Sequence, residues 1–403
     1  MKAPPSTHST MLFSGLLIFF AFGSVSSFQY HGVAMEQLMG MSPTAIGNLC
    51  TLGALSAMAA PLIASLVASV LPNPNILLSL SLLFLGVLSG VFPYLRNSYA
   101  IALVVMSISI AISLTYTTSM TNIQISTRSY GNTFFIILRA IGTLGFALAC
   151  YFSSRLAVYC ALEYVFLFFS LLSGVAFLFS LKNLDVIPLT VSQGSVMRTF
   201  NHSFISTLKL FCERTTILLI FFCFISSICS SMGMALLGNF ITNELGENNA
   251  YVGTAWSVAT FMEIPFILSS IFILKYFKLK TLLLIGLIVM TIRMFLTYTC
   301  TSPEVFLLIQ ALHGVYFGTT TVGISIYLKQ AYGEDNLHLT QTYSNMIIAG
   351  IGAAIAGKIN GFIWSDFGLR NIYLVAACFG LVSFLGILLC VRIPNNINSY
   401  GEK

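Results

Sequence analysis

Four side chains that could carry chemistry lie inside segments that are otherwise apolar enough to cross a membrane. Three of them, Glu263, Arg293 and His313, occur in successive hydrophobic segments of the C-terminal half, and the fourth, Arg139, lies in the N-terminal half. A charge at the centre of a spanning helix costs about 2.5–3.5 kcal/mol on insertion scales, so such residues often mark a substrate or ion pathway. We therefore expect them to build a polar site inside a helical bundle.

The three C-terminal groups can share one layer of that bundle. At about 1.5 Å per residue, Glu263, Arg293 and His313 lie roughly 12 to 18 Å from the same membrane face. A buried guanidinium keeps its charge, so Arg293 needs a carboxylate or a substrate anion, and Glu263 is its natural partner. A carboxylate whose partner moves can bind and release a proton. The alternatives are a static ion pair for these two residues and a bond to a neighbouring backbone for His313.

The surroundings of two of these groups sharpen the prediction. Pro265, two residues after Glu263, removes a backbone donor and weakens the helix beside the acid. Arg139 has no acid inside the first five predicted helices to pair with. We expect it to meet an anionic or hydrogen-bonding substrate, or the amides of Asn122 and Gln124, with snorkelling to the membrane surface as the alternative. Three aromatic side chains could stack on a ring-shaped ligand or be ordinary core residues: Tyr116, Trp256 and Tyr316.

Composition places these residues in a membrane protein. Of 403 residues, 57% are hydrophobic and 7% are charged, with a mean hydropathy of +0.92, whereas a soluble domain carries about 25% charge. The net charge of +6 then reports membrane orientation and not nucleic-acid binding. The nine cysteines form no CxxC pair, and we expect neither a metal site nor disulfides. No phosphate loop, HExxH or Ser/His/Asp grouping indicates an enzyme, and no cofactor is expected.

Hydrophobic stretches define the helices that position the polar groups. At about 20 residues per span, the sequence predicts twelve. They run over residues 10–30, 43–70, 75–93, 99–120, 133–152, 162–181, 215–238, 251–274, 281–300, 304–327, 341–363 and 371–391. The predicted fold is an all-α membrane protein with two pseudo-symmetric six-helix bundles, residues 1–181 and 215–403, joined by a cytoplasmic linker, 182–214.

Lys and Arg in the loops predict the orientation. With the N-terminus inside, the cytoplasmic segments hold twelve of them and the outer loops hold three, so both termini should be cytoplasmic in the plasma (inner) membrane. A lone Lys2 precedes the first apolar run and no clear cleavage site follows it. We therefore expect that run to be a spanning helix and not a signal peptide.

The two halves also carry a weak internal repeat. Gly47 and Gly253 are 206 positions apart, and Pro61 and Pro265 are 204 apart. Thr-rich stretches in the predicted fourth and tenth helices repeat at about the same offset. With twelve spans and a central linker, this repeat favours two related bundles with a site at their interface near the midplane.

Several stretches of the chain resemble the major facilitator superfamily, and more narrowly its lactose-permease-like and nucleoside:proton symporter branch. They are Gly40–Gly47 leading to Ala60–Leu62, Arg139–Phe146, Glu263–Pro265, Arg293, Ala311–Gly318 and Gly361–Gly368. The resemblance implies alternating access by two rocking bundles. It also implies that Arg139 binds substrate, that Phe146 stacks on it, and that Glu263, Arg293 and His313 recognise substrate and handle protons.

The chain departs from this branch at two acidic positions. The fourth helix reads Thr121-Asn-Ile-Gln-Ile125 where lactose-permease-like carriers have an acid, and Tyr316 stands where they have the proton-carrying carboxylate. Galactoside recognition is therefore not expected, and proton coupling would depend mainly on Glu263.

The resulting expectation is a secondary active transporter for a small polar organic solute, such as a nucleoside, sugar or related metabolite, working by proton symport. Its partners would be the lipid bilayer, the solute and protons, without nucleic acid, and the chain would act as a monomer. An uncoupled facilitator or an efflux pump is the alternative within transport. A non-transporting membrane receptor or a membrane-embedded enzyme is the alternative from another class, although the short loops speak against it.

Overall fold

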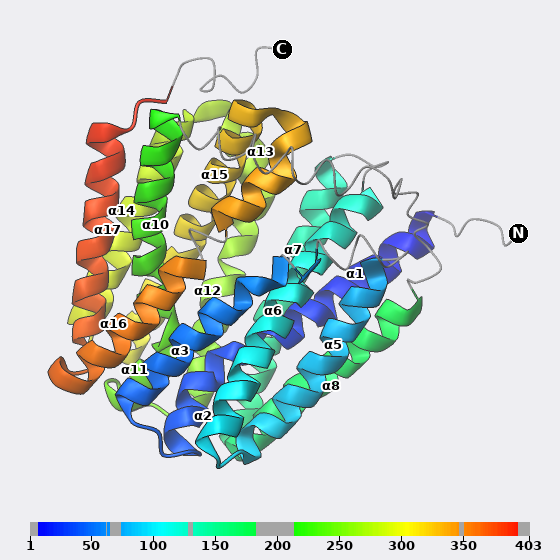
Figure 1. Ribbon diagram of the computed structural model, residues 1–403, viewed down its shortest axis with the longest axis vertical. Coiled ribbons are helices and arrows are strands. Elements are labelled where there is room, and N and C mark those ends of the chain that lie inside the picture. The colour runs from blue at the N-terminus through cyan, green and yellow to red at the C-terminus, as the bar shows by residue number, and fades with distance from the viewer. Residues whose placement is uncertain are drawn as a thin grey trace, which may run out of the picture. The chain divides into compact units, whose positions relative to one another are not determined.

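The described part of the chain is helical throughout. The computed structural model describes residues 7–61, 63–64, 74–127, 132–182, 213–345 and 350–393, and every regular element in these ranges is a helix (Figure 1). Within these ranges, nine helical runs are long and apolar enough to cross a membrane. Backbone polar groups in hydrocarbon must be satisfied within the protein, and a helix satisfies them within its own segment. The all-α prediction is confirmed.

Contacts divide the chain into two compact units. The first unit contains Met1–Ser42, Leu52–Val191 and Leu237–Ile264, and the second contains Pro43–Thr51, Ser192–Leu236 and Pro265–Lys403. Each unit therefore includes a short segment from the other half of the sequence. The predicted division into residues 1–181 and 215–403 stays a prediction, and most of the predicted linker lies outside the described residues.

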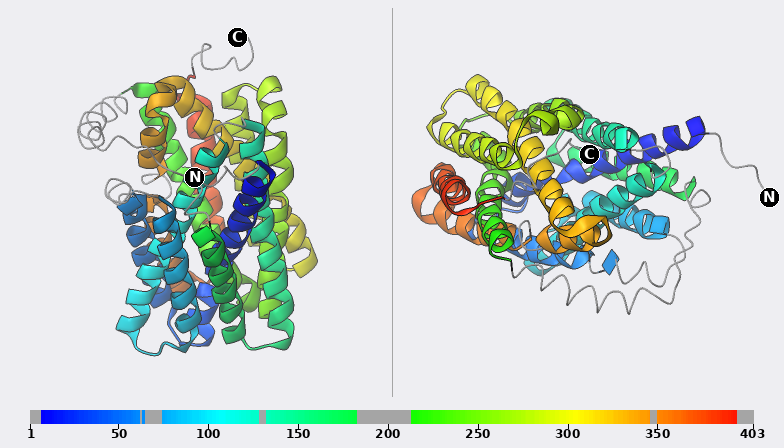
Figure 2. Two further views of the ribbon diagram at one scale, coloured as in Figure 1. Left: turned by 90° about the vertical axis from the view of Figure 1, so that its right-hand side faces the viewer. Right: turned by 90° about the horizontal axis from the view of Figure 1, so that it is seen from above.

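In the first unit, one nearly continuous helical run precedes a set of long helices. The run is α1 (Thr7–Val25), η1 (Ser26–Tyr30) and α2 (His31–Gln37). The other elements are α5 (Pro74–Val91), η2 (Phe92–Tyr94), α6 (Ser98–Thr127), α7 (Asn132–Tyr159), α8 (Leu162–Lys182), α11 (Leu237–Asn243) and α12 (Asn249–Phe261). Helix α1 packs against α6, α7 and α8, and α12 lies along α7 (Figures 1 and 2).

Buried apolar side chains hold the first unit together. Leu17 and Ala21 of α1 pack with Leu82 of α5 in one core cluster, and Ile18 and Phe22 pack with side chains of α6 and α7 in another. Gly145 of α7 lies where a Cβ would overlap the backbone of Phe19. Because glycine has no side chain, α1 and α7 can approach to backbone contact there.

The second unit is built from a second group of helices. They are α10 (Arg214–Ala235), most of α13 (Glu263–Tyr276), α14 (Leu279–Thr299), α15 (Pro303–Asn345), α16 (Gly352–Phe367) and α17 (Asn371–Cys390), with the first residues of α3 (Pro43–Ala57). Helix α14 packs against α15 and α17, and α10 packs against α16 and α17. The core cluster of the second unit includes Leu219, Leu283 and Ile387.

Several predicted helix boundaries differ from the structure. Helix α6 continues past residue 120 to Thr127, and α7 continues past residue 152 to Tyr159. The first span continues past residue 30 to Gln37 through a 3₁₀ turn, and α15 continues past residue 327 to Asn345. The predicted span 341–363 is therefore wrong at its start, since α16 begins at Gly352. Hydropathy marks only the part of a helix that suits hydrocarbon. The polar stretch that begins near Lys329 continues the helix without an apolar signal and contains no Pro to end it.

The predicted span 251–274 is interrupted beside its acid. Helix α12 ends at Phe261, Met262 separates the two helices, and α13 begins at Glu263. Pro265 has no N–H to donate to the carbonyl of Phe261, four residues earlier, so the backbone ladder cannot run unbroken through this point.

Candidate functional site

Glu263 lies in the first turn of α13, directly after the helix interruption. Its side chain is buried, with 7% of its surface exposed. Met262 keeps an α-helical backbone conformation and its N–H bonds to the carbonyl of Val258, so Glu263 lies beside a one-residue interruption and not at a free helix end.

In the first unit, Arg139 lies among aromatic rings and one hydroxyl. Its guanidinium carbon lies 5.2 Å from the centre of the Phe22 ring and 5.9 Å from that of Tyr116. Its Nη1 donates a hydrogen bond of 2.6 Å to Thr143, one turn further along α7. Aromatic faces attract a guanidinium through their quadrupole, and Arg can stack on a ring while its N–H groups point elsewhere. We call this set the Arg139 cluster.

Three rings form a second group in the same unit. Trp256 of α12 lies edge-on to Phe28, with ring centres 5.0 Å apart and planes at 87°. Phe146 lies 6.0 Å from Phe28 and 6.3 Å from Trp256. The indole Nε1–H of Trp256 is buried and has no hydrogen-bond partner among the described residues. This aromatic cluster therefore combines ring faces with one unused donor.

The two groups are joined by one face of α7. Arg139, Thr143 and Phe146 follow each other at spacings of four and three residues, which places them on one side of the helix. A guanidinium, a hydroxyl and a ring thus form a continuous stripe. Thr143 and Phe28 were not predicted. The four-residue spacing from Arg139 could have indicated Thr143, whereas nothing in the local sequence distinguishes Phe28 from the other phenylalanines.

Asn122 and Gln124 are the two amides predicted as partners of Arg139. The side-chain amide of Asn122 is buried and donates a 2.6 Å hydrogen bond to Asn75 of α5. Its position therefore fits a link between α6 and α5. The side chain of Gln124 lies outside the described residues.

In the second unit, Arg293 is almost completely buried, with 1% of its surface exposed. Its Nη2 donates to Oε1 of Gln310, at 2.5 Å, and its Nη1 lies 3.3 Å from Nδ1 of His313. The sulfur atoms of Met234 and Met290 lie 3.5 Å and 3.9 Å from the guanidinium. The structure thus brings Arg293 and His313 together as predicted, around an amide that was not predicted.

Gln310 could have been found in the sequence, because it lies three residues before His313 and shares its helix face. A guanidinium only donates hydrogen bonds, so a bond between Nη1 of Arg293 and His313 needs Nδ1 as its acceptor. Next to this pair, the Tyr316 hydroxyl lies 3.5 Å from that of Ser226, and its ring centre lies 6.4 Å from that of His313. The predicted pairing of Glu263 with Arg293 joins residues of different units and stays a prediction.

These donor sets suit recognition of an organic solute better than metal chemistry. Within the described ranges, no three His, Cys, Asp or Glu side chains come together as metal ligands. The groups that do come together are guanidinium, hydroxyl, amide and indole donors beside ring faces. Such groups hydrogen-bond to hydroxyl and carbonyl oxygens and stack on ring-shaped molecules.

Sequence comparisons connect the chain to known transporters. Residues 12–375 match the MFS_1 like family. The chain is 23% identical over 401 residues to the maltose permease of Geobacillus stearothermophilus, covering 96% of this chain and 94% of that protein. It is also 23% identical over 163 residues to a putative sugar efflux transporter of Deinococcus radiodurans, an alignment that spans 40% of this chain and 41% of that protein.

Solved structures show the same fold. The nucleoside transporter NupG superposes with a TM-score of 0.79 at 17% identity, covering 96% of this chain and all (100%) of that one. A D-xylose-proton symporter superposes with a TM-score of 0.69 at 14% identity, covering 96% of this chain and 98% of that one. These matches confirm the predicted twelve-helix major facilitator fold. Because the family match covers most of its length, the chain belongs to the MFS_1 like family of the major facilitator superfamily and is a multi-pass membrane transporter of a small molecule, not an enzyme.

Proposed function

We propose that the protein is a secondary active transporter that moves a nucleoside or sugar across the membrane by alternating access, in symport with protons. The observation that supports this most strongly is the stripe of Arg139, Thr143 and Phe146 beside the unused indole donor of Trp256. A solute that fits it needs a ring to stack and oxygen or nitrogen acceptors around that ring.

Both solute classes meet these requirements. The apolar face of a sugar ring packs on an aromatic ring, while its hydroxyls accept from guanidinium and indole N–H groups. A nucleoside adds a planar base that can stack on Phe146 or Trp256. The proteins that this chain resembles include, by name, a nucleoside transporter, a maltose permease and a xylose-proton symporter.

Glu263 is the proposed proton carrier. It is a buried carboxylate at a helix interruption, where a small backbone change alters its hydration and its hydrogen bonds. His313 is a weaker candidate, because it lies 3.3 Å from the guanidinium of Arg293, where a second positive charge would be repelled. In this proposal, the polar side chains of Arg293 and Gln310 interact with the solute and do not carry the proton.

The test is uptake of nucleosides, sugars and small organic acids by proteoliposomes, with and without an imposed proton gradient. We expect one class to accumulate only with the gradient, and Glu263→Gln to abolish accumulation while exchange across the membrane continues. Glu163→Gln is the matched control, since Glu163 also lies in the first turn of a helix, α8, and should behave as wild type. Gradient-independent flux that survives Glu263→Gln would contradict the coupling.

Proton symport has one alternative within transport, which is an uncoupled facilitator or an exporter. The chain lacks acids at two positions where the resembling carriers have them, and one relative is described as a sugar efflux transporter. An uncoupled facilitator or an exporter would show flux that does not depend on an inward proton gradient. As part of the proposal, the protein works as a monomer in the plasma membrane with both termini in the cytoplasm, and it binds no nucleic acid.

A further inference from the structure

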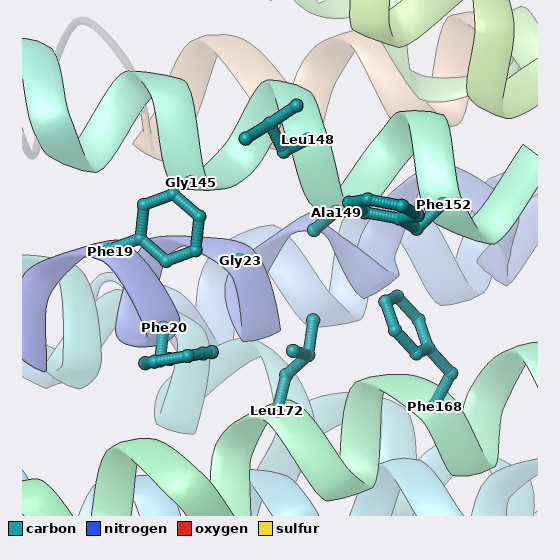
Figure 3. A pocket seen from close by; sticks show the side chains of 9 residues that line it. All are labelled: Phe19, Phe20, Gly23, Gly145, Leu148, Ala149, Phe152, Phe168 and Leu172. Carbon is teal, nitrogen blue, oxygen red and sulfur yellow. The ribbon is translucent and has the colours of Figure 1, made fainter. Parts of the chain in front are cut away.

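A cavity of about 160 Å³ lies among α1, α7 and α8 of the first unit (Figure 3). All nine residues that line it belong to candidate membrane spans. In Figure 3, Phe20, Phe168 and Leu172 point from two helices toward the same space as Phe152. None of these residues belongs to the Arg139 cluster or to the aromatic cluster, so this cavity is separate from the candidate solute site.

The lining of the cavity is entirely apolar. Four Phe and two Leu side chains form its walls, and Gly23, Gly145 and Ala149 contribute no bulk. Where Gly145 meets α1, the two helix backbones touch, which closes the cavity on that side. On the other side it reaches the surface of the unit, since 54% of Phe152 is exposed. An apolar space of this size holds no ordered water and accepts an apolar ligand.

A positive charge and three exposed tyrosines lie near the cavity, toward one end of α7 and α8. On α7, Phe152, Arg155 and Tyr159 come at intervals of three and four residues and therefore share one face. The Arg155 guanidinium is exposed, lies 5.2 Å from the Tyr151 ring centre and donates through Nε to the Tyr151 hydroxyl at 3.3 Å. On α8, Tyr164 lies one turn before Phe168. Exposed tyrosines are typical of the membrane–water interface.

We propose that this cavity binds one acyl chain of a phospholipid, whose phosphate is held by Arg155. The acyl chain matches the apolar walls in the membrane-spanning part of the helices, and the phosphate matches the guanidinium at the level where the helices end. A guanidinium recognises phosphate through paired N–H donors, and its stacking on Tyr151 already restricts its position. The lipid then packs against the α1–α7 pair, the same two helices that carry Phe22, Arg139 and Phe146. The inference does not depend on the proposed function.

Native mass spectrometry of the detergent-purified chain, titrated with dioleoyl phosphatidylglycerol, tests it. We expect wild type to retain one lipid per chain with saturable affinity. Arg155→Ala should weaken binding about fivefold, the contribution of one basic residue near anionic lipid. Leu148→Trp, which fills the cavity from a partly exposed position, should remove the saturable component. Phe168→Ala, which removes one side chain from the cavity wall, should also weaken lipid binding.

Two variants serve as matched controls. Arg96→Ala removes another exposed guanidinium, one that is already bonded to the carbonyls of Pro93 and Leu95. Leu171→Trp makes the same addition at a side chain that is 70% exposed and does not line the cavity. Both should bind lipid as wild type. Equal losses in the controls would overturn the proposal in favour of non-specific surface lipid. If wild type is a dimer and Leu148→Trp is a monomer, the cavity binds a second copy of the chain and the proposal is overturned. If inorganic phosphate alone displaces the lipid, an acyl-chain site is excluded.

Discussion

Two helix contacts, one in each unit, are built around the repeated glycines. In the second unit, a Cβ at Gly47 of α3 would overlap Gly361 of α16 and lie 2.7 Å from the carbonyl oxygen of Gly357. In the first unit, a Cβ at Gly253 of α12 would lie 2.5 Å from the carbonyl oxygen of Cys150 on α7. Both glycines therefore allow two backbones to touch, which gives the repeat seen in the sequence a physical cause.

The surroundings of the two contacts differ. Around Gly253, the hydroxyls of Ser154 and Thr254 pair at 2.8 Å. In the second unit the bonds near Gly47 join different groups: Thr51 donates to the carbonyl of Ala354 at 3.0 Å, and Lys358 donates to Asn48 at 2.8 Å.

The first unit also carries a carboxylate bond between α2 and α11. Glu36 accepts hydrogen bonds from Asn239 at 2.6 Å and from Asn243 at 2.8 Å. The comparison teaches that glycine occurs in both halves because a larger side chain would not fit between two backbones in contact. The polar groups around the two glycines differ because the contact does not require particular ones.

The largest effect should come from Gly47→Leu. Its closest neighbours are backbone atoms of two other glycines, which cannot move aside, so the added side chain must separate α3 from α16. Overpacking costs about 1–3 kcal/mol, and we expect the upper part of that range as a lowered thermal midpoint, with loss of solute flux. Gly174→Leu is the control, since a Cβ there meets nothing within 4 Å. An unchanged midpoint for Gly47→Leu would contradict the described contact.

Gly253→Leu should cost less than Gly47→Leu. One of its three nearest neighbours is the Tyr30 hydroxyl at 2.6 Å, the far end of a side chain that can shift, whereas Cβ of Ser154 at 2.9 Å is fixed by its backbone. We expect a destabilisation smaller by about 1 kcal/mol, measured by thermal unfolding of both variants in the same detergent. The reverse order would show that the side chains around Gly253 are as rigid as the glycine backbone around Gly47.

Removing the polar groups should have a smaller effect, and an unequal one. Glu36→Ala leaves the amides of Asn239 and Asn243 without their carboxylate, and we expect a loss of about 1 kcal/mol, because the site is partly hydrated. Lys358→Ala breaks an exposed bond and should change stability by less than about 0.5 kcal/mol. Thermal midpoints of the two variants measure the difference, and equal values would show that these polar bonds of the two units contribute equally to stability.

The sequence predicted some features of the structure and missed others. Hydropathy located the helices, and the cost of burying charge identified Arg139, Arg293 and His313 as residues that need partners. The actual partners depend on how helices pack. Phe28 was missed because nothing in the sequence distinguishes it from the other phenylalanines, whereas the spacing of Gln310 from His313 could have indicated it. The end of α15 was misplaced because the helix leaves the apolar layer before it ends.

The account depends most on the stripe that contains Arg139. The most direct measurement is exchange of labelled nucleoside or sugar by proteoliposomes that contain Arg139→Lys, compared with wild type and with Arg155→Lys. Lysine keeps the charge but loses the planar group that stacks on Phe22 and bonds Thr143. The account predicts at least about a tenfold loss of exchange for Arg139→Lys, equivalent to about 1.4 kcal/mol of solute binding, and wild-type exchange for Arg155→Lys. Full exchange by Arg139→Lys would contradict it.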